Sequence, residues 1–129
     1  MEDDMRWNHA GIKSSDVERS LHFYCDILGL RKLETITILE KNYYFVGNDD
    51  FSIEIEAGNP GDQQAEPKAM TGLYHIALTV DDLDSLAAKL HEHEVNFIIP
   101  PVQLRADRKI CFIEDPDGVY IQMIQYINR

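Results

Sequence analysis

The chain has 129 residues, 44% of them apolar and 27% charged, which is ordinary for one globular domain with a sizeable core. The formal net charge of −11 argues against nucleic acid and anionic membranes as partners, because phosphate would be repelled. No apolar run approaches the roughly 18 residues of a membrane span. The acidic N-terminal stretch MEDDMRW is the opposite of a signal peptide, so we expect a cytoplasmic protein.

The first half of the chain is predicted to form a strand, a helix and then three strands. A short strand containing His9 is followed by Ser15-Asp16, a pair that suits a helix N-cap. Apolar side chains then recur on one helical face, at Val17, Leu21, Tyr24 and Leu28. Gly29 stands where helices commonly end. Strand-like segments follow at residues 33–40, 42–48 and 51–57.

Residues 58–72 form a linker in this interpretation. The stretch GNPGDQQAEPKAMTG contains three glycines and two prolines and has no apolar period. The two halves that it joins are too short, at about 60 residues each, to bury much core alone. We therefore expect one domain over residues 1–129, with a first module at about 5–57 and a second at about 73–127.

The second half repeats the first. His75 aligns with His9, and Asp82 aligns with Asp16, both at an offset of 66. Apolar residues of the second predicted helix share a face, at Leu83, Leu86, Ala87 and Leu90.

Three strand segments follow this helix: residues 96–105, interrupted by a proline pair that cannot continue a helix, then 109–115 and 119–125. The predicted fold is α+β, built from tandem βαβββ modules.

Four polar side chains occupy equivalent positions of the two modules. His9 and His75 lie in the first strand of each half, and Glu54 and Gln122 lie in the last. A single polar residue in a strand is usually structural or solvated. Here, however, four of them converge if the modules pair about a pseudo-two-fold axis. Imidazole, carboxylate and amide donors suit zinc, nickel, manganese or ferrous iron, so the repeat predicts a divalent-metal site.

Other candidate residues fit simpler roles. Glu56 shares the face of Glu54. We expect His22 to be structural, and His91 and His93 to lie at a solvated helix end. Segment 43–45 suits either a pocket or the core, and Cys25 and Cys111 are expected to be buried, reduced thiols. The chain contains no Gly-rich phosphate loop, nucleophile elbow or CxxC motif.

The chain resembles the vicinal oxygen chelate superfamily, which includes glyoxalase I, extradiol dioxygenases and bleomycin-resistance proteins. The resemblance rests on the stretches NHAGIKSSDVERSLHFYCDILGL, GLYHIALTVDDLDSL and FIEDPDGVYIQM. It implies a partly open β-barrel, a divalent metal, and a small-molecule substrate with two adjacent oxygens. It also implies a homodimer. By position, it implies metal ligands at His9, Glu54, His75 and Gln122.

Gln122 departs from the pattern of glyoxalase-like members. At this position they usually have a Glu, which is both a metal ligand and a proton-transfer base. An amide oxygen can bind a metal, but the amide cannot accept a proton near neutral pH. We therefore expect Gln122 to be a neutral ligand and Glu54 to take the catalytic base role in a lyase or isomerase. Glu56 is a further candidate for that base. Two alternatives stay open: a metal-free binding protein of the bleomycin-resistance type, whose acidic charge suits a cationic ligand, and an extradiol-type dioxygenase using iron.

Overall fold

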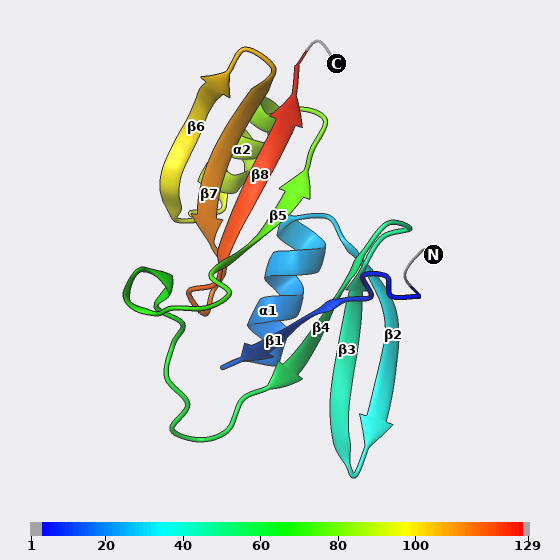
Figure 1. The fold of residues 1–129 in the computed structure, drawn as a ribbon. Coiled ribbons are helices and arrows are strands. Elements are labelled where there is room, and N and C mark those ends of the chain that lie inside the picture. The colour runs from blue at the N-terminus through cyan, green and yellow to red at the C-terminus, as the bar shows by residue number, and fades with distance from the viewer. Residues whose placement is uncertain (1–3, 128–129) are drawn as a thin grey trace. The chain divides into compact units, whose positions relative to one another are not determined.

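A computed structural model describes residues 4–127 and divides the chain into two compact units (Figure 1). The first unit runs to Asp62 and the second starts at Gln63, so the boundary falls inside the predicted linker. Each unit contains a strand, a helix and three further strands, as the sequence repeat predicts. None of the helices within residues 4–127 has the length and apolar character needed to cross a membrane.

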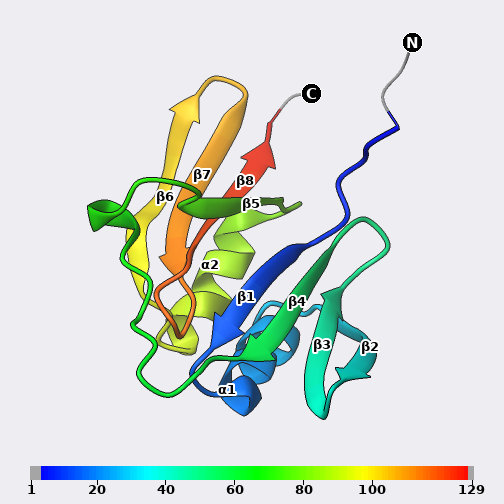
Figure 2. The same ribbon diagram turned by 60° about the horizontal axis from the view of Figure 1, so that its bottom comes forward.

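The first unit is built on a four-stranded sheet in the order β1-β4-β3-β2. β1 runs parallel to β4, and the other neighbours are antiparallel. Figure 2 shows β1 beside β4, with β3 and β2 following outward. The strands are β1 (Ala10–Ser14), β2 (Arg31–Ile38), β3 (Lys41–Gly47) and β4 (Ser52–Ala57).

One helix packs on this sheet, and its second half is wound more widely than an α-helix. α1 (Val17–Leu21) continues into the π-helix η1 (His22–Ile27), and Asp16 caps its start by accepting from the Arg19 N–H at 3.2 Å. The wider turn changes which side chains face the sheet. Besides Leu21 and Tyr24, the core therefore takes Phe23 and Ile27, whereas Val17 and Leu28 are only half-buried.

The second unit repeats this topology in the order β5-β8-β7-β6, again with one parallel pair, β5 with β8. The Asp82 carboxylate caps its helix by accepting from the Ser85 N–H at 3.1 Å. Of the four apolar residues expected on one face of that helix, Leu83 and Leu90 are fully buried, and Leu86 and Ala87 are half-buried. The elements are β5 (His75–Thr79), α2 (Leu83–Glu92), β6 (Phe97–Arg105), β7 (Arg108–Glu114) and β8 (Tyr120–Tyr126).

Buried Asp115 stabilises the turn that precedes β8. Its Oδ1 accepts from the N–H groups of Asp117 and Val119 at 2.8 and 2.9 Å. The linker is attached to this turn, because the Ala65 N–H donates to the Asp117 carbonyl at 3.2 Å. A short 3₁₀ helix, η2 (Pro67–Ala69), follows in the linker. The part of the linker that belongs to the second unit and this turn therefore form one local structure.

Three predictions need adjustment. β1 begins at Ala10, so His9 directly precedes the strand that was expected to contain it. Both cysteines are free thiols, but Cys25 is only half-buried, whereas Cys111 is fully buried. Burial raises the pKa of the Cys111 thiol to about 11. The proline pair lies within β6, which tolerates the missing N–H groups because β6 is an edge strand.

Candidate metal site

The first unit brings His9 and Glu54 together on the sheet face opposite the helix. Glu54 pairs with Gly11 in the parallel β1–β4 ladder, and His9, two residues earlier, points to the same side as Gly11. The Nε2 atom of His9 lies 3.9 Å from Oε2 of Glu54, and these side chains are 32% and 24% exposed. Gly11 lies beside this carboxylate, and a Cβ at its position would be in ordinary van der Waals contact with Glu54 Oε1, at 3.6 Å.

The separation of these two atoms is chemically informative. At 3.9 Å they are too far apart for a hydrogen bond. On tetrahedral zinc, with bonds of about 2.0–2.2 Å, an imidazole nitrogen and a carboxylate oxygen are about 3.4 Å apart. A cation bound by both side chains would therefore draw the two atoms together by roughly 0.5 Å from their observed separation.

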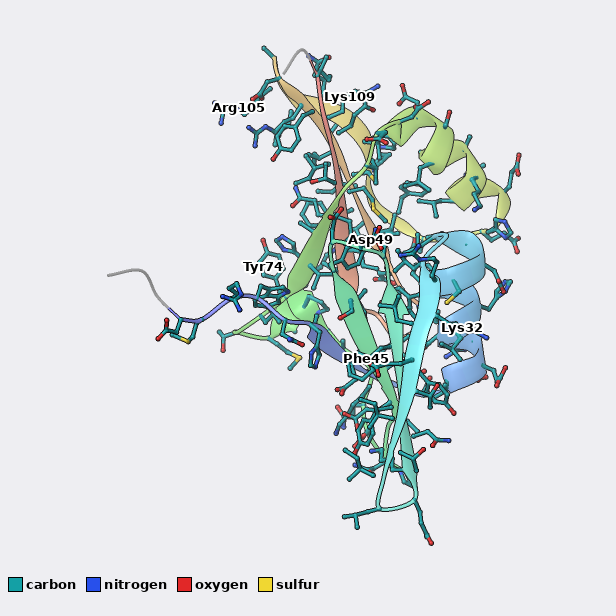
Figure 3. All side chains as sticks on the ribbon, turned by 90° about the vertical axis from the view of Figure 1, so that its right-hand side faces the viewer. Lys32, Phe45, Asp49, Tyr74, Arg105 and Lys109 are labelled. Carbon is teal, nitrogen blue, oxygen red and sulfur yellow. The ribbon has the colours of Figure 1, made fainter. Side chains whose placement is uncertain are left out.

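Two neighbours orient the His9 ring. Its Nδ1 atom lies 2.6 Å from Oδ1 of Asn8. The edge of Phe45 meets the ring at a centroid distance of 5.2 Å and an interplanar angle of 80°. Phe45 projects from β3, where it is labelled in Figure 3, and it pairs with Glu54 across the β3–β4 ladder. His9, Phe45 and Glu54 thus form one contact group.

Glu56 has a different environment from Glu54, although both are on the same face. The Lys41 ammonium lies 2.7 Å from Glu56 Oε2, and this hydrogen bond raises the pKa of Lys41. The Glu54 carboxylate instead faces the imidazole of His9. The structure thereby separates two carboxylates that the sequence alone left as joint candidates for a proton acceptor.

The second unit places His75 and Gln122 in the same register as His9 and Glu54. Gln122 pairs with Ala77 in the parallel β5–β8 ladder, and His75 is again two residues earlier on the same face. The His75 ring contacts Phe112 edge-on at 5.1 Å and Tyr74 at 4.4 Å. Its Nδ1 atom is buried and has no hydrogen-bond partner within residues 4–127.

Phe112 is a residue that the sequence analysis missed. It pairs with Gln122 in the β7–β8 ladder, as Phe45 pairs with Glu54 in the β3–β4 ladder. Phe45 and Phe112 are 67 residues apart, between the 66 residues that separate the two histidines and the 68 that separate Glu54 and Gln122. The sequence repeat therefore could have identified this phenylalanine pair. Each unit therefore carries a histidine, a phenylalanine and an oxygen donor in equivalent positions.

The remaining histidines lie elsewhere. Exposed His22 pairs with Asp26 on its own helix, with 2.8 Å between Nδ1 and Oδ2. His91 is the penultimate residue of α2 and His93 follows that helix, and both are exposed, as expected.

The donor chemistry of the two pairs fits a divalent metal. Imidazole nitrogens, a carboxylate and an amide oxygen suit zinc, nickel, manganese or ferrous iron. Within the described part of each unit, no three His, Cys, Asp or Glu side chains cluster as metal ligands.

Known proteins resemble this chain over most of its length. The family model described as Glyoxalase/Bleomycin resistance protein/Dioxygenase superfamily matches residues 6–123. A lactoylglutathione lyase from Haemophilus influenzae is 35% identical over 91% of this chain and 90% of its own length. A probable lactoylglutathione lyase from Synechocystis is 33% identical over 94% and 95%.

A solved glyoxalase family protein from Bacillus cereus has the same fold. It aligns with a TM-score of 0.82 and 16% identity, covering 98% of this chain and 97% of its own. The tandem βαβββ architecture predicted from the repeat is thus confirmed, with open four-stranded sheets. The chain belongs to the Glyoxalase/Bleomycin resistance protein/Dioxygenase superfamily.

Proposed function

We propose that this protein is a glyoxalase-like lyase or isomerase that uses a divalent metal and acts on a small substrate with two adjacent oxygens. The observation that carries the proposal is the pair His9 and Glu54, whose facing atoms are separated by 3.9 Å on an open sheet face. The equivalent register of His75 and Gln122 supports it, as do the two relatives named lactoylglutathione lyase.

In this proposal, His9, Glu54, His75 and Gln122 hold the metal. A bound divalent metal would polarise the two substrate oxygens as a Lewis acid. The set carries one carboxylate, so its formal charge is −1, because the Gln122 amide is neutral. Phe45 and Phe112 keep the two imidazole rings in place by edge contacts.

Proton transfer falls to Glu54. Gln122 cannot accept a proton, and Glu56 is already hydrogen-bonded to Lys41. Glu54 is half-buried, and its charged neighbour is His9, at 3.9 Å, and not a lysine. The nearby Lys13 pairs with Asp62 instead, at 3.5 Å. The Glu54 carboxylate is therefore the base available on this face within residues 4–62.

We also propose that the protein works as a homodimer, as its superfamily resemblance implies. Apolar side chains exposed on the outer strands β2 and β6 support this, because exposed apolar edges are typical sites of association.

A second function, metal-free binding of a cationic ligand, is favoured by two features of the sequence. Gln122 occupies a position where a carboxylate would bind a metal more strongly, and the chain as a whole is acidic. Under this alternative, the same sheet faces would line a ligand groove and no proton would be transferred.

Metal analysis separates the two functions. The protein is purified without chelator or affinity metal, incubated separately with nickel, zinc, manganese and ferrous iron, and analysed by plasma mass spectrometry. We expect about one tightly held metal per chain, and formation of lactoylglutathione is the first reaction to assay with that metal. No binding of any of the four ions would reject the metal-dependent proposal in favour of the binding protein.

Three variants assign the residues. His75→Ala should lose the metal, because an imidazole ligand is removed. Glu54→Gln should weaken metal binding and lower turnover by roughly 10²-fold or more, since the base is lost. Glu56→Gln is the matched control and should preserve both, because that carboxylate serves Lys41. Equal losses in the two glutamate variants would contradict the role given to Glu54.

A further inference from the structure

We infer that Asn8 is a positioning residue, which fixes the imidazole proton of His9 on Nδ1 and so directs the lone pair of Nε2 at Glu54. The observation is the 2.6 Å contact between His9 Nδ1 and Asn8 Oδ1. A carbonyl oxygen only accepts hydrogen bonds, so the hydrogen in this contact belongs to Nδ1. Asn8 itself is not one of the four proposed ligands.

The tautomer follows from that hydrogen bond. A neutral imidazole carries one N–H, and the hydrogen bond made by one ring nitrogen decides the state of the other. With the proton on Nδ1, Nε2 carries a free lone pair. That atom is the one that faces Glu54 Oε2 at 3.9 Å. His9 is thus prepared to bind a cation before any cation arrives.

His75 has a different environment from His9. Its Nδ1 is buried without a hydrogen-bond partner among the described residues. The residue that precedes it, Tyr74, contributes an aromatic edge at 4.4 Å where Asn8 contributes an acceptor. The two units are therefore equivalent in register but not in the control of their histidines. The first unit is the better organised half of the pair.

The consequence for metal affinity rests on the proposed function. Hydrogen-bond partners of ligating histidines typically contribute 10- to 100-fold in metal affinity, because they fix the tautomer and the ring orientation. Asn8→Ala should therefore weaken nickel binding about tenfold. Asn8→Asp, which keeps an acceptor oxygen at the same place, should restore it.

The tautomer itself is measured on metal-free protein. Long-range ¹H–¹⁵N spectra of the histidine rings, taken about two pH units above the ordinary histidine pKa of about 6.5, distinguish Nδ1–H from Nε2–H. We expect His9 to be Nδ1–H in the wild type and in Asn8→Asp. In Asn8→Ala its proton should move towards Nε2, whereas the His75 signals should stay unchanged. Asn59→Ala, an exposed asparagine in the same unit, serves as the control.

The outcomes are distinct. A His9 ring that is Nε2–H in the wild type, or that keeps its tautomer in Asn8→Ala, overturns the inference. A wild-type protein that shows the expected Nδ1–H signal and binds none of the tested metals supports the positioning role of Asn8 and overturns the proposed function instead. Loss of nickel affinity in Asn8→Ala without any change of tautomer also counts against the inference.

Discussion

Gly118 lies in the turn that precedes β8, and its backbone conformation shapes that turn. Its φ of +86° is a conformation that side chains with a Cβ rarely adopt. A Cβ at this position would also lie 2.6 Å from the Ala65 carbonyl oxygen and 3.0 Å from the Gln64 side chain. The glycine is therefore needed for the turn and for the attachment of the linker to it.

Gly118→Ala should be more destabilising than a glycine substitution with backbone strain alone. Gly61, at φ +89°, is the matched control, because nothing lies within 4 Å of its Cβ position. We expect Gly61→Ala to cost about 1 kcal/mol of unfolding free energy. Gly118→Ala should cost about 1–3 kcal/mol more, from the steric overlap. Urea unfolding followed by circular dichroism measures both, and equal costs would show that the linker does not pack on the turn.

At the scale of elements, both helices begin with an aspartate cap. Asp82 accepts from the Ser85 N–H and from its hydroxyl, at 3.1 and 2.8 Å. The backbone hydrogen bond from Ser85 is the main reason that the pKa of Asp82 is lowered. Asp16 makes the corresponding backbone contact at the start of α1. These local caps were predictable because they depend on neighbours within three residues.

The stabilisation by Asp82 should depend on pH. A carboxyl group with a lowered folded-state pKa stabilises the fold above its unfolded pKa of about 3.9, and this contribution is lost as the pH falls through the folded-state value. Asp82→Ala should therefore lower the free energy of unfolding at pH 7, and the difference from wild type should shrink below about pH 4. Asp81→Ala is the neighbouring control. A pH-independent difference would contradict the capping role.

The turn of the β2–β3 hairpin was not predicted correctly from the sequence. The strand was expected to run to Glu40, but it ends at Ile38, because Leu39 and Glu40 adopt φ values of +51° and +68°. Such left-handed pairs usually contain Asn or Gly, and neither is present. The local sequence therefore does not predict this turn. Pairing of β2 with β3 fixes it.

At the scale of the molecule, both outer strands carry exposed apolar side chains. Strand order places β2 at one edge of the first sheet and β6 at one edge of the second. Each presents a partly exposed apolar row, made by Leu33, Ile36 and Ile38 on β2 and by Ile99, Val102 and Leu104 on β6. Rows of this kind are typical association surfaces, and this supports the proposed homodimer.

Sedimentation equilibrium tests the dimer directly. We expect a mass near twice the 14.9 kDa of one chain. Val102→Glu should weaken association at least tenfold, about 1.4 kcal/mol, because it puts a charge into the apolar row. Leu73→Glu, an exposed residue outside both sheets, adds the same charge as a control. A wild-type protein that stays monomeric would refute the homodimer.

The sequence by itself determined the duplicated element order, the helix caps and the four candidate ligand positions. These features depend on local spacing: alternation along strands, helical periodicity, and capping residues. The convergence of all four ligands in one metal site stays a prediction. The equivalent register of the two histidines with the last-strand residues agrees with the repeat.

Only the tertiary structure decided which neighbours each candidate has. Lys41 reaches Glu56 from an adjacent strand, which leaves Glu54 to face His9. Phe112 reaches His75 from a strand more than thirty residues away in the chain. The physical reason is that a sheet places side chains beside one another through pairing between strands distant in sequence, whereas the sequence pattern reports only which face each side chain occupies.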